Sequence, residues 1–249
     1  MTNRLNKLIA AGFSLTLMAP AFGDTITLDM VVRDFKVSHP DFESFLGYQA
    51  GMVESTLGVD GTPVYVPGAS KITSAATFYD WYHNVPGTNI TSIKQISLDN
   101  GLGATTGGIY TYDNQSFFPI DGEGWGNEGY SHNYHFTVQI ATMFTYQAGQ
   151  NFSFRGDDDV WVFINKQLVV DLGGVHGPMN GSVNLDTLGL TAGQNYSLDL
   201  FFAERHTVGS SFKIETSIAN LISVPVPEPG TLTLLGLGLL GLGLRGRRI

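Results

Sequence analysis

The chain has 249 residues, 43% of them hydrophobic and 12% aromatic, which is enough for a large buried core and excludes a disordered protein. Its formal charge of −9 argues against a nucleic-acid partner, because binding to phosphates requires clustered Lys and Arg. There is no cysteine, so disulfide scaffolds, thiolate zinc sites and cysteine nucleophiles are excluded.

Positive and negative charges are separated along the chain. Five of the 13 basic residues lie near the two ends, whereas all 22 acidic residues lie between Asp24 and Glu228. The body of the chain is therefore strongly acidic. Such a body repels anionic polymers and offers carboxylates to hard cations such as Ca²⁺.

Residues 1–23 have the layout of a secretory signal peptide. A basic start is followed by an apolar run, and the small residues Ala21 and Gly23 precede a cleavage point before Asp24. The alternative is a short N-terminal helix of the domain, but the run is not amphipathic. We expect the body of the chain to be exported.

The first half of the body is irregular, with two short helices expected. Residues 38–45 carry an N-cap signal and an early proline, and residues 74–83 place aromatic side chains at helical spacing. Residues 100–130 are rich in glycine, aspartate and aromatic residues, and we expect them to form a long loop of the kind that often carries function.

The second half predicts β-strands. Apolar and aromatic residues occupy the even positions over residues 133–146, and the same alternation recurs over residues 196–202 and 212–218. Residues 160–164 are apolar on both faces, as in a central strand. Residues 24–220 are therefore predicted to form one all-β domain, an antiparallel, jelly-roll-like β-sandwich with one or two short helices.

Three adjacent aspartates, Asp157, Asp158 and Asp159, form the strongest chemical signal in the sequence. They stand at a turn between two predicted strands, where one bound Ca²⁺ would relieve the repulsion among the carboxylates. The alternative is a solvated acidic turn that caps its own backbone amides.

The run from Asp157 to Asp171, followed by Gly-Gly-Val-His-Gly at residues 173–177, resembles the bacterial fibro-slime domain. It is also similar to the wider carbohydrate-binding family named for the anthrax protective antigen. The resemblance extends from about Ile26 to Ile218, with the Asp-rich strand pair as its specific part.

The resemblance implies a calcium-dependent glycan site. Asp157 and Asp158 match a pair that holds Ca²⁺ in lectin-type members, while Asp159 stands where glycine is common and adds a candidate ligand. The resemblance further implies a candidate metal or glycan loop made of Asp171, His176 and Asn180.

Aromatic residues of the expected long loop offer stacking surfaces for sugar rings, and Trp125 and Tyr130 are the candidates. The alternative is ordinary packing of the loop onto the sandwich. No nucleophile elbow, phosphate loop or dinucleotide fingerprint is present, and structural roles suit the histidines better than zinc binding or catalysis. We therefore expect no enzymatic activity.

The C-terminal segment, residues 221–249, combines Pro-Glu-Pro at 227–229, an apolar stretch from Leu232 to Leu244 and a terminal arginine cluster. It is similar to the PEP-CTERM sorting signal of Gram-negative bacteria. That resemblance implies export across the inner membrane, at least transient contact of the segment with the membrane as a hydrophobic helix, and processing by an exosortase-type enzyme. The alternative is an uncleaved anchor, although the apolar stretch is shorter than the ~20 residues that span a bilayer.

Together these features predict an exported protein of the cell surface or extracellular matrix. Its expected function is calcium-dependent binding of an extracellular polysaccharide through the Asp-rich loop. Two alternatives stay open: a structural matrix component without a glycan site, and a secreted glycan-cleaving enzyme.

Overall fold

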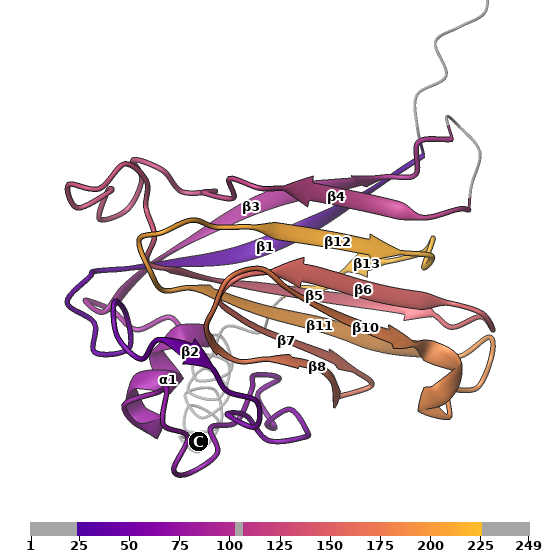
Figure 1. Cartoon of the computed structure of the whole chain (residues 1–249). Coiled ribbons are helices and arrows are strands. Elements are labelled where there is room, and N and C mark those ends of the chain that lie inside the picture. Colours follow the sequence, from indigo (N-terminus) through magenta and orange to yellow (C-terminus); the bar gives the residue numbers. More distant parts are fainter. Residues whose placement is uncertain (1–23, 103–106, 226–249) are drawn as a thin grey trace, which may run out of the picture.

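Antiparallel β-strands are the main regular structure in residues 24–102 and 107–225, which the computed structural model describes (Figure 1). The all-β fold class predicted from the sequence is confirmed. The expected signal helix and C-terminal apolar helix lie outside the described residues. The elements are β1 (Thr25–Phe35), β2 (Gly47–Tyr48), α1 (Ala75–Tyr82), β3 (Asn89–Asp99), β4 (Tyr110–Asn114), β5 (Phe136–Thr145), β6 (Asn151–Gly156), β7 (Asp159–Ile164), β8 (Gln167–Leu172), β9 (Gly174–Val175), β10 (Met179–Asn184), the 3₁₀ helix η1 (Leu185–Leu188), β11 (Asn195–Glu204), β12 (Phe212–Thr216) and β13 (Ile222–Ser223).

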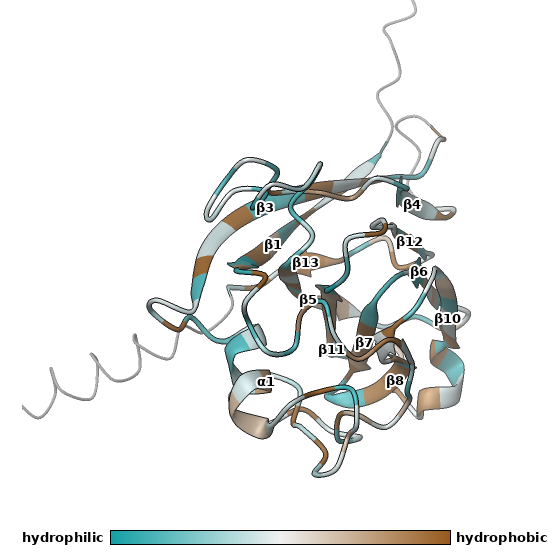
Figure 2. Ribbon diagram, turned by 60° about the vertical axis from the view of Figure 1, so that its left-hand side comes forward, coloured by the Kyte–Doolittle hydropathy of each residue, from teal (hydrophilic) through white to brown (hydrophobic). Residues whose placement is uncertain are grey.

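One 11-stranded sheet has the order β10-β6-β12-β4-β3-β1-β5-β11-β7-β8, with β13 paired to β5. The sheet folds over on itself, so that β1, β3 and β4 lie opposite β7, β8 and β10 (Figures 1 and 2). The two ends of the order, β8 and β10, contact each other. A small second sheet pairs β2 with β9.

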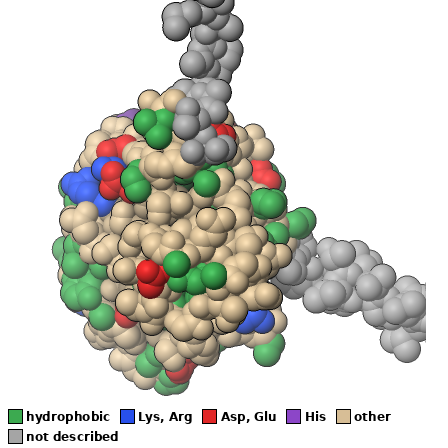
Figure 3. Space-filling view, turned by 90° about the vertical axis from the view of Figure 1, so that its right-hand side faces the viewer, with side chains coloured by type: hydrophobic (Ala, Val, Ile, Leu, Met, Phe, Trp, Pro, Cys, Tyr) green, Lys and Arg blue, Asp and Glu red, His purple; other side chains and the backbone are tan. Residues whose placement is uncertain are grey.

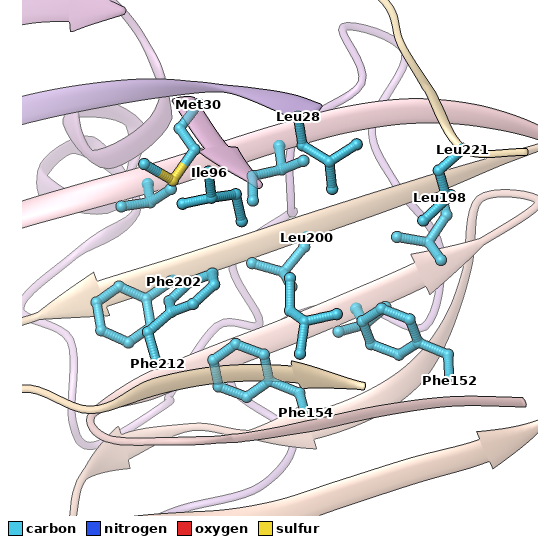
Figure 4. Close-up of a cluster of buried hydrophobic side chains, with 14 of the residues drawn as sticks. Leu28, Met30, Ile96, Phe152, Phe154, Leu198, Leu200, Phe202, Phe212 and Leu221 are labelled. Atoms are coloured by element: carbon cyan, nitrogen blue, oxygen red, sulfur yellow. The ribbon is translucent and has the colours of Figure 1, made fainter. Parts of the chain in front are cut away.

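The main core fills the space between the two layers of the sandwich. Phe154, Phe202 and Phe212 point toward one another across it, with Leu28 and Leu198 further along (Figure 4). Phe136, Val138, Ile140 and Phe144 of β5 belong to this core, as the alternation predicts. The strand is not half-buried, however, because Thr137, Gln139 and Ala141 on its other face are buried as well.

A second hydrophobic cluster covers the outer face of β7 and β11. Trp161 and Phe163 of β7 pack there against aromatic residues of α1, including Phe78 and Trp81. This explains why residues 160–164 are apolar on both faces. The predicted helix over residues 74–83 is confirmed as α1, with Ser74 as its N-cap in a capping box.

Two local expectations are wrong. Residues 38–45 form turns instead of a helix, and Glu43 and Phe45 adopt left-handed φ angles of 57° and 64°. The amide of Glu43 donates to the carbonyl of Arg205, so a tertiary contact overrides the local helix signal. Residues 100–130 are also not loop throughout, because β4 pairs with β3 and β12 within them.

The seam between β8 and β10 allows a test of the fold. A Cβ atom added at Gly181 on β10 would overlap the stiff, branched Val170 side chain on β8. We expect Gly181→Ala to destabilise the protein by about 1–3 kcal/mol in urea unfolding. Gly177→Ala is the control, since a Cβ there meets no atom within 4 Å. Adding Val170→Ala to Gly181→Ala should remove the clash, so the absence of any rescue would contradict this account of the seam.

Candidate functional site

The acidic turn between β6 and β7 points its three carboxylates in two directions. Asp157 and Asp158, joined by a cis peptide bond, are 8% and 4% exposed and line a pocket of about 500 Å³. Asp159 is 0% exposed and does not line this pocket. The structure thus brings two of the three predicted cation ligands to an accessible site and turns the third into the interior.

Asp159 forms a buried ion pair with Arg205, the residue that follows β11. Its Oδ2 atom lies 2.6 Å from Arg205 Nε, and both side chains are 0% exposed. The amide of Gly174 donates to Asp159 Oδ1 at 2.6 Å. These contacts give Asp159 a structural role at the base of the turn, because a buried charge requires such partners.

The two pocket-lining aspartates are held by backbone amides. The amide of Ser211 donates to Asp157 Oδ1 at 2.5 Å, and the amides of His176 and Arg205 donate to the two oxygens of Asp158 at 3.2 and 2.9 Å. These hydrogen bonds fix the direction of both carboxylates. They also leave lone pairs, since an ionised carboxylate can accept about four hydrogen bonds.

Negative charge is crowded at this turn. Burial, together with repulsion from Asp159, raises the pKa of Asp158 to about 8. Burial also raises the pKa of Asp157, and the pKa of the fully buried Glu204 rises through burial and repulsion from both pocket aspartates. Arg205 pairs with Asp159 and Arg155 lies near Asp157, yet burial still raises the pKa values, so a cation in the pocket would stabilise the ionised forms of these acids.

The donor chemistry fits a hard cation such as Ca²⁺, which prefers oxygen ligands. No group of three or more His, Asp and Glu side chains arranged to hold a metal ion occurs in residues 24–102 and 107–225. A cation at Asp157 and Asp158 would therefore need further oxygens from the backbone, water or the hydroxyls of a bound ligand.

The rim of the pocket combines apolar and imidazole side chains. His176 and Val175 lie on one side, and His206 and Val208 come from the loop after β11. Leu46, which is 62% exposed, closes the rim from a distant part of the sequence. The predicted loop residue His176 is therefore at the site.

Residues 41–51, here called the strap, contact both loops that form this rim, namely the loop that follows β9 and the loop that follows β11. The Glu43 carboxylate accepts from the backbone amide of Thr207 at 3.0 Å and lies 3.6 Å from His206 Nε2. On the other side, β2 of the strap pairs with β9, which immediately precedes His176. The strap thus fixes the separation of the two loops.

The other predicted loop residues lie outside the pocket. Asp171 accepts from Trp161 Nε1 at 3.0 Å and from the amide of Gly51 at 2.7 Å, so it anchors the end of the strap. Asn180 lies opposite Arg155 in the pairing of β10 with β6 and lines a separate pocket of about 240 Å³. The structure does not bring Asp171 and Asn180 together with the aspartate pair.

The candidate stacking residues Trp125 and Tyr130 also lie outside the pocket. The ammonium of Lys36 lies 4.1 Å from the centroid of the Trp125 ring, and the Trp125 amide donates to Asp34 at 2.5 Å. Tyr130 is 40% exposed and contacts the His135 ring edge-on at 5.7 Å. Both contacts correspond to packing of the segment onto the sandwich.

Sequence reasoning did not assign Leu46, His206 and Val208 to the site. More than a hundred residues separate Leu46 from the aspartate pair, and no local signal marks the contact of the strap with the loop after β11. At the opposite end of the sandwich, hydrophobic, acidic and basic side chains are interspersed on the surface (Figure 3).

No helix among the described residues is both long and apolar enough to span a membrane. The predicted C-terminal hydrophobic segment falls outside them.

Two family descriptions match the chain. The PA14 domain matches residues 106–222, and the PEP-CTERM protein-sorting motif matches residues 225–248. Both resemblances expected from the sequence are confirmed at this level, and the narrower fibro-slime assignment stays a prediction.

Similar proteins include psiR and psiQ of Dictyostelium discoideum. The chain is 47% identical to psiR over 215 residues, which is 79% of this chain and 21% of psiR. It is 46% identical to psiQ over 223 residues, or 83% of this chain and 22% of psiQ. The chain thus spans about a fifth of the length of these relatives.

Among solved structures, the chain is similar to a PA14 sugar-binding domain from an RTX adhesin, with a TM-score of 0.31 and 18% identity over 47% of this chain and 75% of that one. It is also similar to the PA14 domain of the antifreeze protein MpAFP, with a TM-score of 0.34 and 10% identity over 87% of this chain and 99% of that one.

The raised pKa of Asp158 predicts how stability depends on pH without added cations. The pKa of Asp158 is 3.8 in the unfolded chain and about 8 in the folded protein, so the folded state binds the proton more tightly. The resulting contribution to the free energy of unfolding is complete below pH 3.8 and is lost as the pH rises through about 8. We expect the melting temperature in chelator to fall between about pH 4 and pH 8, because over this range the folded state keeps a proton that the unfolded state has lost. Asp158→Asn should flatten this slope, and an unchanged slope would show that Asp158 is not responsible.

Proposed function

We propose that this chain, which carries a PA14 domain and a PEP-CTERM sorting motif, is an exported, non-catalytic surface protein. In this proposal it binds extracellular polysaccharide through Ca²⁺. Asp157 and Asp158 hold the ion in this proposal. The hydroxyls of a sugar complete its coordination shell, so ion and glycan bind together.

The observation that carries the proposal is the pair of carboxylates, Asp157 and Asp158, that line one pocket side by side. Their direction is fixed by backbone amides before any ligand arrives, which lowers the entropic cost of binding. The apolar rim at Leu46 and Val208 suits the C–H surface of a sugar ring beside the ion. Calcium is the ion proposed because the donors are hard oxygens.

The sorting motif supports the proposed destination. We propose that residues 1–23 direct the chain across the inner membrane of a Gram-negative bacterium and that residues 221–249 pass to an exosortase-type enzyme. The body, residues 24–220, is then the fibro-slime-type domain that works in the extracellular matrix. The structural alternative, in which the acidic turn only rigidifies the fold, differs in predicting no bound glycan.

Aspartate variants test the proposal, because the three carboxylates have different surroundings. Calcium at ~100 times its Kd should stabilise the wild-type protein by about 2.7 kcal/mol. Asp158→Ala should abolish this stabilisation and also abolish calcium-dependent retention on a glycan array. Asp159→Ala should instead lower the stability of the calcium-free protein by about 3–5 kcal/mol, since it leaves Arg205 buried without its partner.

The matched control is Asp29→Ala, which removes an exposed acid of β1 from a part of the surface outside the pocket. It should retain the calcium response in differential scanning fluorimetry and the glycan signal. Equal melting temperatures of the wild-type protein in millimolar calcium and in chelator would refute the ion site. A calcium response without any glycan signal would favour the structural alternative.

The C-terminal motif leads to a separate prediction. Cells that contain the sorting enzyme should release a product that ends near Pro229, because the short apolar segment acts as a processing signal. Intact-mass measurement of the released protein checks this. If residues 232–249 are still attached, the segment is an uncleaved anchor.

A further inference from the structure

A second pocket, of about 400 Å³, lies beside α1 and shares no lining residue with the aspartate site. It is formed by residues 58–65 and by α1 with the residues that flank it. All of these residues precede the part of the chain that the PA14 domain matches. Its volume is within the range of about 300–1,000 Å³ that is usual for small-molecule sites.

One wall of this second pocket is a tyrosine ring held in a fixed orientation. The imidazole of His83 stacks on Tyr79 with 3.6 Å between ring centroids and 8° between ring planes. Tyr79 is nevertheless 49% exposed. Tyr65 and Phe78 also line the pocket. A ring that is supported on one face and open elsewhere presents a flat apolar surface with little entropy left to lose on binding.

The polar wall of the pocket is formed by Asp60 and His83. His83 Nδ1 lies 2.7 Å from the carbonyl oxygen of Tyr79, and His83 Nε2 lies 3.1 Å from Asp60 Oδ2. These two contacts fix the orientation of the imidazole ring and hold one oxygen of the Asp60 carboxylate against it.

The Asp60 carboxylate retains limited capacity to bind a ligand. Its Oδ1 accepts from the amide and the hydroxyl of Thr62 at 3.1 and 2.9 Å, while Oδ2 accepts from His83. One lone pair on Oδ2 is left for a further donor, and the Asp60 side chain is 46% exposed. A ligand hydroxyl can use this lone pair next to the tyrosine ring.

We infer that this second pocket binds a neutral pyranose ring without calcium. A pyranose has an apolar C–H face for Tyr79 and hydroxyl donors for Asp60, and these are the two surfaces that the pocket offers. The Asp60 carboxylate, already held by Thr62 and His83, suits a hydroxyl donor better than the carboxylate of a uronic acid. The inference rests on the proposed function only in taking a polysaccharide as the polymer that supplies the sugar ring. A chain with two separate sugar sites could link two polysaccharide strands.

Amide NMR of the full-length chain in chelator tests the second site. The probes are the methyl glycosides of glucose, galactose and mannose, each titrated into the millimolar range. We expect shift changes confined to residues 58–65 and 75–83. Tyr79→Ala should weaken binding by about tenfold or more, whereas Tyr79→Phe should retain it because the ring is kept.

Two control variants separate this site from the proposed calcium site. Tyr130→Ala removes another exposed tyrosine, 40% exposed against 49% for Tyr79, and should leave the titration unchanged. Asp158→Ala should also leave it unchanged while losing the calcium-dependent response. Spectra of Tyr79→Ala that superimpose outside residues 58–65 and 75–83 show that this variant is folded.

Three results would overturn the inference: no shift changes with any of the glycosides, equal binding by wild type and Tyr79→Ala, or a response only to tetramethylammonium, which would make the pocket a cation site. Loss of calcium-dependent binding alone would refute the proposed function and leave the second site intact.

Discussion

The buried ion pair between Asp159 and Arg205 is the contact on which this end of the sandwich depends. The same guanidinium donates to the carbonyls of Asp41 and Lys71 at 3.1 and 2.8 Å and lies 4.8 Å from the centroid of the Trp81 ring. One side chain thus connects β7, the strap and the segment before α1. Because a charge buried in this way is costly without its partners, these elements are fixed relative to one another.

This arrangement also explains why neighbouring acids differ in their chemistry. Asp159 begins β7 and is neutralised in the interior, while Asp157 and Asp158 precede the strand and face the pocket with backbone amides as their main partners. The ion pair therefore provides a rigid base, and the charge that is available to a ligand lies immediately before it. A single turn combines a structural carboxylate with two that line a pocket.

Much of the sandwich could be predicted from local patterns, whereas the assembled site could not. The alternation along β5 and the aromatic spacing over residues 74–83 are signals within a few residues, and both correspond to observed elements. In the strap the local helix signal is misleading, since the conformation is set by contacts to Arg205 and Thr207 more than 150 residues later. For the same reason the sequence could not show that Asp159 faces inward or that Asn180 lies apart from the aspartate pair.

Other parts of the fold cover the outer strands of the long sheet. On β8, the amide of Leu168 donates to the carbonyl of Ser55, and that of Leu57 donates to the carbonyl of Lys166 at the adjoining turn. At the other end of the order, β10 lies against β8, with Gly181 allowing the close approach. An edge strand that is covered in this way is a poor template for pairing with a second copy of the chain, which disfavours strand-to-strand polymerisation through β8 and β10.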